Sequence, residues 1–165
     1  QGGTRMLKVL IADDESKVCQ LIEKLVDWDA LDMKVAAVAE NGIDALEKIK
    51  EVHPDIVITD IRMPGYDGLD LIRLGKEESP NTEFVIISGY RHFEYAQMAI
   101  RYGVNAYLLK PIKKDELTET LKRLSTRFRA QTEQLSQEEK TRLAIRSDEK
   151  NLRLGLFTGS CGEKK

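Results

Sequence analysis

The stretch DIVITDIRMPGYDG, residues 55–68, joins a short apolar run to a cluster of polar and turn-forming residues. Residues 56–59 are apolar or β-branched, which is typical of a strand that is buried on both faces. Asp60 follows directly, and Pro64, Gly65 and Gly68 then indicate a loop. The stretch therefore predicts a buried parallel strand that ends in a carboxylate.

Four more runs of this kind lie at residues 8–12, 35–39, 84–87 and 106–109. Apolar residues at helical spacing separate them and also follow the last run: Val18, Leu21, Ile22 and Leu25; Ile43, Leu46 and Ile49; Leu69 and Ile72; Phe93, Ala96, Ala99 and Ile100; Leu117, Leu121, Leu124 and Phe128. This alternation predicts an α/β domain with a doubly wound, five-stranded parallel sheet and helices on both faces. In such a domain the ligand site lies at the carboxyl ends of the strands.

The composition bounds the possible classes of protein. The 165 residues are 41% hydrophobic and 33% charged, which excludes both a membrane protein and a chain too polar to fold. A net charge of -2 gives no broad basic field, so this chain is not expected to bind DNA by itself. Cys19 and Cys161 match no disulfide or zinc pattern, and the start of the chain does not resemble a signal peptide. These features favour a cytoplasmic location.

The chain is expected to divide into four parts. Residues 1–5 precede Met6 and have the composition of an expression remnant, residues 6–127 form the globular domain, and residues 159–165 form a disordered tail. In residues 128–158 the apolar pattern thins, which predicts a helical extension. A solvated helix, a dimerising helix and a linker to a further domain all remain open for this part.

Reactive side chains stand at four of the five strand ends. Asp13 and Asp14 follow the first strand, Asp60 the third, Ser88 the fourth and Lys110 the fifth. A single aspartate at such a place is usually a helix cap or a turn former, but parallel strands bring all of these ends to one edge. Three carboxylates that meet there repel one another unless a cation is bound. Because all the ligands are oxygens, the expected cation is Mg²⁺.

Lys110 and Ser88 each have two interpretations, and Gly68 has a structural one. Lys110 could form a structural salt bridge with a nearby aspartate, or it could bind the oxygens of a phosphoryl group. Ser88 could cap the next helix, or its hydroxyl could donate to a phosphoryl oxygen. Gly68 is expected where the backbone near the site leaves no room for a side chain.

With these residues in place, residues 6–127 resemble the receiver domain of two-component response regulators, which has a flavodoxin-like fold. The resemblance rests on the acidic triplet at residues 13–15, on DIRMPGYDG, on ISGY with Ser88, and on YLLKPI with Tyr107, Lys110 and Pro111. It implies that Asp60 is the phosphoacceptor and that Ser88 and Lys110 bind the phosphoryl oxygens. It also implies that Asp13, Asp14, Asp60 and the main-chain carbonyl of Arg62 bind Mg²⁺, that Ser88 and Tyr107 act as the switch, and that the Lys110–Pro111 bond is cis.

The segments VDWDALDMKV, AENGIDALEKI and SGYRHFEYAQMAI are similar to receivers joined to AraC-type DNA-binding regions. The resemblance implies phosphorylation by a histidine kinase, homodimer formation on phosphorylation, and DNA binding only through an output domain that this chain lacks. It implies a signalling domain rather than an enzyme. Two alternatives remain, a degenerate receiver that acts without phosphorylation and a phosphohydrolase of the haloacid dehalogenase kind. The hydrolase would need an aspartate where this chain has Arg62.

Overall fold

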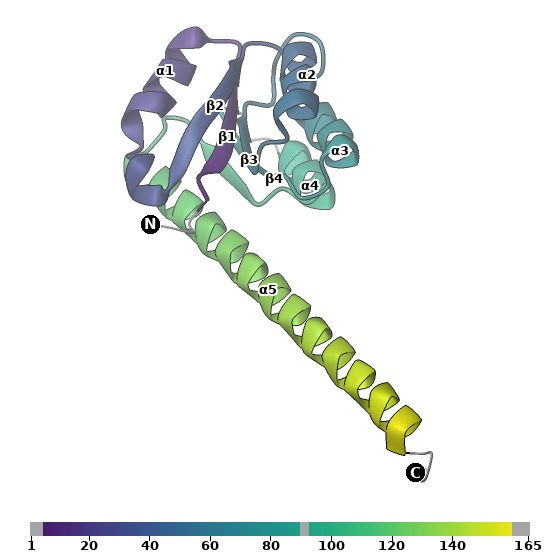
Figure 1. Cartoon of the computed structure of the whole chain (residues 1–165). Coiled ribbons are helices and arrows are strands. Elements are labelled where there is room, and N and C mark those ends of the chain that lie inside the picture. The colour runs from purple at the N-terminus through teal and green to yellow at the C-terminus, as the bar shows by residue number, and fades with distance from the viewer. Residues whose placement is uncertain (1–4, 90–92, 160–165) are drawn as a thin grey trace. The chain divides into compact units, whose positions relative to one another are not determined.

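The structure is a computed structural model that describes residues 5–89 and 93–159. The predicted remnant, apart from Arg5, and the predicted tail, apart from Gly159, lie outside these residues. The elements are β1 (Leu7–Ala12), α1 (Ser16–Leu25), the 3₁₀ turn η1 (Asp29–Leu31), β2 (Met33–Ala39), α2 (Gly42–Val52), β3 (Ile56–Thr59), α3 (Gly68–Glu78), β4 (Glu83–Ser88), α4 (Phe93–Arg101), β5 (Ala106–Leu109) and α5 (Lys114–Gly159). All except η1 and β5 are labelled in Figure 1.

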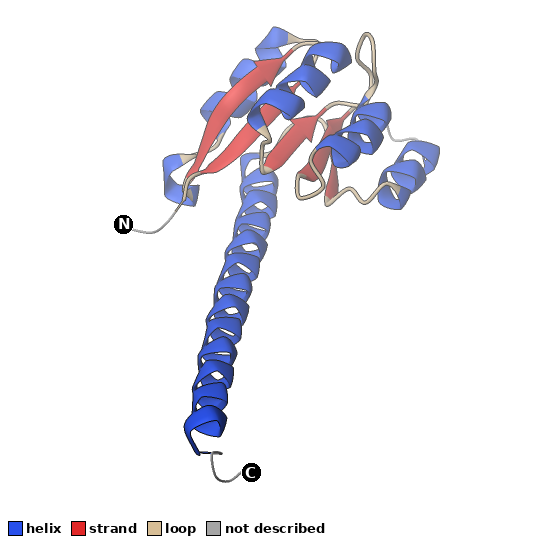
Figure 2. Ribbon diagram, turned by 45° about the vertical axis from the view of Figure 1, so that its right-hand side comes forward, coloured by secondary structure: helices blue, strands red, loops and turns tan. Residues whose placement is uncertain are grey.

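The five strands form one parallel sheet in the order β2-β1-β3-β4-β5, with helices packed around it (Figure 2). This confirms the predicted doubly wound fold. Every predicted strand is present, and the observed ones begin up to two residues earlier in the chain. The strand order reverses between β1 and β3, so the crevice in which this kind of fold binds ligands lies over these two strands.

The central strands β1, β3 and β4 are buried on both faces, as their continuous apolar runs predict, whereas the edge strands β2 and β5 are mostly half-buried. Leu10, Val57 and Ile86 belong to a core cluster with residues of α2, α3 and α4, which pack next to one another in that order. Val9 and Ile11 alternate with Leu10 along β1 and are also fully buried. They face the other side of the sheet, where α1 lies in Figure 1. Because both faces of the three central strands are covered, polar groups can gather there only at the ends of the strands.

The helical periodicity was correct, but the predicted buried face was wrong at three positions. Leu21 of α1, Ile43 of α2 and Ile100 of α4 are 46%, 56% and 71% exposed. In α1 Ile22 is buried, as predicted, but the second buried residue is Cys19 rather than Leu21, because the helix is rotated so that the small thiol faces inward. A spacing of three or four residues gives the period of an apolar stripe, but it does not settle which residue lies at its edge.

Contacts divide the chain into two units, residues 1–125 and 126–165. In the first unit, α5 begins by burying Leu117, Leu121 and Leu124, as predicted. In the second unit, α5 continues to Gly159, and Leu143 is exposed. No helix in the described part of the chain is both long enough and apolar enough to cross a bilayer.

The Phe84 side chain is fully buried on β4, and a Cβ added at Gly75 of α3 would lie only 2.8 Å from its ring. Replacing Phe84 with alanine should leave a cavity and lower the free energy of unfolding by about 3–5 kcal/mol, measured by urea denaturation. The control Ile100→Ala removes an exposed side chain and should change it by less than about 0.5 kcal/mol. Equal losses in the two variants would contradict this description of the core.

Candidate phosphoacceptor and metal site

The sheet continues by one hydrogen bond beyond several strand ends, and these bonds fix the backbone of the site. Asp13 N donates to Ala39 O (3.1 Å), Asp60 N to Ala12 O (3.0 Å) and Lys110 N to Ser88 O (2.8 Å). Each side chain of interest therefore starts from a backbone position that the neighbouring strand holds. This is why residues far apart in the sequence reach one edge in a defined arrangement.

Three carboxylates meet at this edge, as predicted. One oxygen each from Asp13, Asp14 and Asp60 lies within 4.8 Å of the others. Asp13 and Asp60 are only 2% and 7% exposed, while Asp14 faces solvent. A hard cation that keeps part of its water shell needs this combination of several oxygen ligands and one open side. The residues present therefore fit Mg²⁺.

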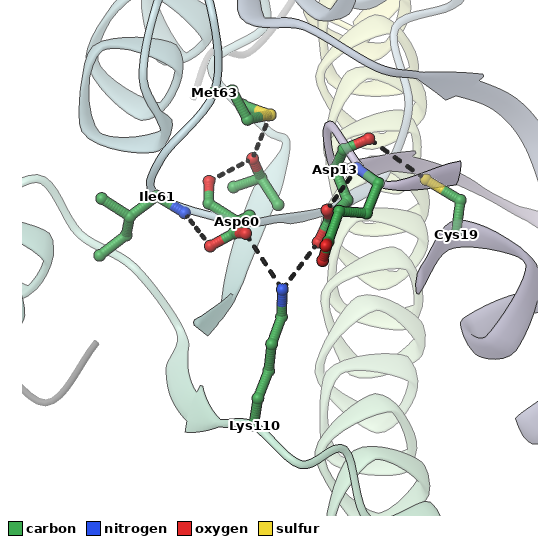
Figure 3. Close-up of polar contacts among 8 residues, drawn as sticks. Asp13, Cys19, Asp60, Ile61, Met63 and Lys110 are labelled. Atoms are coloured by element: carbon green, nitrogen blue, oxygen red, sulfur yellow. Dashed lines mark hydrogen bonds and ion pairs between the residues drawn. The ribbon is translucent and has the colours of Figure 1, made fainter. Parts of the chain in front are cut away.

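Lys110 reaches the two buried carboxylates. Its Nζ lies 3.2 Å from Asp13 Oδ2 and 3.1 Å from Asp60 Oδ2, and Figure 3 shows the side chain pointing between them. The salt bridge considered from the sequence is thus present, and it is double. It places the ammonium beside the proposed phosphoacceptor, where a phosphoryl group would also be.

The other oxygen of each buried carboxylate accepts a backbone hydrogen bond. Asp13 Oδ1 accepts from Glu15 N at 2.9 Å, and Asp60 Oδ1 accepts from Ile61 N at 2.7 Å. Both side chains are therefore held in one orientation, with their Oδ2 atoms facing Lys110. Asp13 therefore does stabilise a turn, which is the role considered above for a single aspartate, and it also belongs to the carboxylate cluster.

Burial and charge shift two pKa values in the site. Burial raises the pKa of Asp13, and the Asp60 charge adds to this, although the Glu15 amide and Lys110 act in the other direction. For Lys110, burial acts to lower the pKa, but hydrogen bonding and attraction to Asp60 and Asp13 outweigh it and raise the pKa. The ammonium therefore stays protonated, whereas the charge on Asp13 is incompletely compensated in the metal-free site.

Ser88 and Tyr107 are hydrogen-bonded to each other through their side chains. Ser88 ends β4 and is fully buried, and Tyr107 lies on the neighbouring strand β5. Burial raises the pKa of the Tyr107 phenol, the bond with Ser88 opposes this, and the Asp60 charge raises it further. Whether Ser88 also caps α4 cannot be read from the described residues, because residues 90–92 are not among them.

The remaining predicted positions are Arg62 in the loop after β3, Gly68 at the start of α3, and the Lys110–Pro111 bond after β5. Arg62 lies with Asp14, Tyr95 and other residues around an open pocket of about 330 Å³. Gly68 N donates to Ile61 O at 2.6 Å, and a Cβ at Gly68 would lie 2.2 Å from Asp60 O, so no side chain fits there. The Lys110–Pro111 bond is cis, as predicted.

Several residues that shape the site have no sequence feature that would have identified them. The amides of Glu15 and Ile61 orient the buried carboxylates, but every residue except proline has such a donor. Cys19 Sγ donates to Asp13 O at 3.6 Å (Figure 3), and burial raises the pKa of this thiol to about 11, so it is not reactive. Tyr95 belongs to the helical pattern of residues 93–100, and nothing in that pattern predicts its place in the pocket wall.

Comparisons with known proteins agree on one family. The family model described as "Response regulator receiver domain" matches residues 9–122. The transcriptional regulatory protein YesN of Bacillus subtilis is 40% identical over 76% of this chain, and HptR of Staphylococcus aureus is 36% identical over 72%. These stretches cover only 34% and 46% of the two relatives. The solved receiver domain of AraT, a response regulator from Geobacillus stearothermophilus, is 38% identical, with a TM-score of 0.73 over 77% of this chain and 98% of that domain.

The raised pKa of Asp13 predicts a pH-dependent stability. A carboxyl with a higher pKa in the folded chain favours folding below its ordinary value of 3.8, and this contribution is lost as the pH rises through the folded pKa. In metal-free buffer, Asp13→Asn should therefore gain stability relative to the unmodified chain as the pH rises from about 3 to 7. Urea denaturation across this range measures the difference. A difference that does not change with pH would contradict the assignment.

Proposed function

Because the chain belongs to the response regulator receiver family, we propose that Asp60 accepts a phosphoryl group and that the resulting acyl phosphate switches the domain. The resemblance drawn from the motifs is thereby confirmed at the level of the family. The observation that carries the proposal is the double contact of Lys110 with Asp60 and Asp13 inside a cluster of three carboxylates. A positive charge and a nucleophile are adjacent there, with room for a cation.

In the proposed reaction a carboxylate oxygen of Asp60 attacks phosphorus in line with the bond to the donor. An oxygen–phosphorus bond forms while the bond between phosphorus and the donor atom breaks, and the donor atom keeps the electron pair. The donor atom is a histidine nitrogen of a kinase or the oxygen of a small acyl phosphate. The Lys110 ammonium neutralises charge on the equatorial oxygens. Asp13, Asp14, Asp60 and the Arg62 main-chain carbonyl would hold Mg²⁺, which supplies further charge neutralisation when bound.

The switch would act through Ser88 and Tyr107. The acyl phosphate carries about -1.5 to -2 charge, by analogy with other phosphorylated side chains, in place of the single negative charge of the carboxylate. To carry a two-state domain from 1:99 to 99:1, the modification must favour the active state by about 5.5 kcal/mol. A few charge-assisted hydrogen bonds, each worth about 1.5–3 kcal/mol, are of that order. The existing bond between Ser88 and Tyr107 supports these two residues as the first to respond.

The chain spans about a third to a half of the length of its curated relatives, so the activity of a longer protein is part of the proposal. Residues 6–127 would be the receiver, residues 128–158 the linker, and an AraC-type region the DNA-binding output. A cognate histidine kinase in the cytoplasm would be the phosphodonor. The receiver would perform only its own phosphorylation and dephosphorylation and would not act as an enzyme on other substrates.

Replacing Asp60 with asparagine should abolish labelling by acetyl phosphate in the presence of Mg²⁺, because an amide is not a nucleophile for phosphorus. Intact-protein mass spectrometry measures the added phosphoryl group. Asp70→Asn, which changes a surface carboxylate paired with Arg73, should label normally. Undiminished labelling of the Asp60 variant would refute the assignment. Rapid turnover of the donor without accumulation of labelled protein would favour a hydrolase, and neither labelling nor turnover by the unmodified chain would favour a degenerate receiver.

Phosphorylation should promote homodimer formation through the surface formed by α4, β5 and the start of α5. Ser88 immediately precedes the connection to α4 and Tyr107 lies on β5, so a change in both would alter this face first. The surface carries exposed charges of both signs that can pair across a two-fold axis: Arg101, Lys113, Lys114, Asp115, Glu116 and Glu119. Sedimentation with beryllofluoride and Mg²⁺ should show the doubled mass, and Asp60→Asn should not. A monomer in both states over a wide concentration range would rule out this dimer.

A further inference from the structure

We propose that Gly42, the first residue of α2, is a positioning residue for the metal site and that it acts by holding the loop between β3 and α3 in place. This inference rests on the proposed function, because that loop carries the Arg62 carbonyl, the one proposed Mg²⁺ ligand that is not a side chain. The contacts that carry this effect join Gly42 to the main chain of Pro64 and Tyr66, so the effect is transmitted through the backbone.

The backbone of the loop lies directly against Gly42. Gly42 N donates to Pro64 O at 2.9 Å, and a Cβ added at Gly42 would lie 1.8 Å from Tyr66 O and 2.5 Å from the carbonyl carbon of Tyr66. These are main-chain atoms, so rotation of a side chain cannot relieve the overlap. A larger residue at position 42 must displace the loop or the start of α2.

The loop is fixed at its two ends as well. At the first end Ile61 N donates to the Asp60 carboxylate, and at the second Gly68 N donates back to Ile61 O. Thr59 Oγ1 also contacts the sulfur of Met63 at 3.9 Å. Arg62 lies between these attachments, and the bond from Gly42 to Pro64 reaches the loop from a different part of the chain.

The start of α2 is a firm support because it is tied to the other half of the site. Ala39, the last residue of β2, accepts a hydrogen bond from Asp13 N three residues before Gly42. Asn41 caps α2, with its Oδ1 accepting from Asp44 N at 2.7 Å. Gly42 thereby connects the half that contains Asp13 and Asp14 to the half that contains Asp60 and Arg62. Two sets of ligands on separate loops bind one cation well only if their separation is fixed.

Gly42→Ala isolates this effect. Gly42 does not have a positive φ, and alanine is a better helix former than glycine by about 1 kcal/mol, so α2 itself is not weakened. The overlap with Tyr66 should shift the loop and raise the Mg²⁺ dissociation constant about 10-fold or more, the range found when residues that orient metal ligands are replaced. Shifts of backbone amide resonances during a Mg²⁺ titration, with no phosphodonor present, measure this constant.

Two controls separate positioning from general destabilisation. Gly75→Ala places a Cβ 2.8 Å from the Phe84 ring, in the core and away from the site, and should leave the dissociation constant unchanged whatever it does to the melting temperature. Asp14→Ala removes a proposed ligand and should abolish binding. If Gly42→Ala does not fold, Ile43→Ala decides, because the half-exposed Ile43 side chain lies over Gly65 of the same loop and its removal should weaken binding to a smaller extent.

The outcomes distinguish the inference from the proposed function. If the unmodified chain binds Mg²⁺, Asp14→Ala does not, and a folded Gly42→Ala binds as tightly as the unmodified chain, only the positioning role is overturned. Unchanged binding by Ile43→Ala overturns it in the same way if Gly42→Ala does not fold. If Gly75→Ala weakens binding as much as Gly42→Ala does, the effect is one of stability and the inference is also overturned. If the unmodified chain does not bind Mg²⁺, the proposed function fails and the inference fails with it.

Discussion

Two aspartates, Asp13 and Asp60, are buried side by side at the carboxyl edge of the sheet, and one lysine, Lys110, donates to both. Burying an ionised carboxylate costs several kcal/mol unless a partner compensates for the lost water, and two like charges in contact increase that cost. Lys110 compensates for part of this cost, but its single ammonium pairs with two carboxylates in a cluster of three, and burial still raises the pKa of Asp13. The site is therefore built to attract positive charge, and this constraint explains much of the surrounding structure.

The strand order determines which residue can place a positive charge beside the buried carboxylates. β4 lies between β3 and β5, and neighbouring strands are about 4.8 Å apart, so the backbone of Lys110 is about 10 Å from that of Asp60. A long side chain is needed to cover that distance across the end of β4. The residue that ends β4 is Ser88, whose small side chain occupies little of the intervening space. A parallel sheet with this order thus favours a lysine at the end of its fifth strand, and a shorter cation would not reach.

Sequence reasoning succeeded where a single geometric rule connects residue type to position. Apolar runs predicted five strands, and because parallel strands share one edge, the residues after them predicted the meeting of Asp13, Asp14, Asp60 and Lys110. It failed for helix faces such as those of Leu21, Ile43 and Ile100, because the rotation of a helix about its axis depends on packing that no local pattern records. It also missed Gly42, whose importance comes from the approach of a backbone segment distant in sequence. Main-chain contacts of this kind depend on tertiary structure, and residue type alone does not reveal them.

The bond between Ser88 and Tyr107 would give the proposed switch a direction. A serine hydroxyl has one proton to donate, and its oxygen can accept at the same time. In the unphosphorylated domain either hydroxyl can be the donor in this bond. If Asp60 is phosphorylated as proposed and Ser88 donates its only proton to a phosphoryl oxygen, Tyr107 must donate to Ser88. The two bonds then point the same way and polarise each other, which strengthens both. Phosphorylation would thereby favour the arrangement in which Tyr107 stays turned toward Ser88, and the surface of β5 would follow the charge state of Asp60.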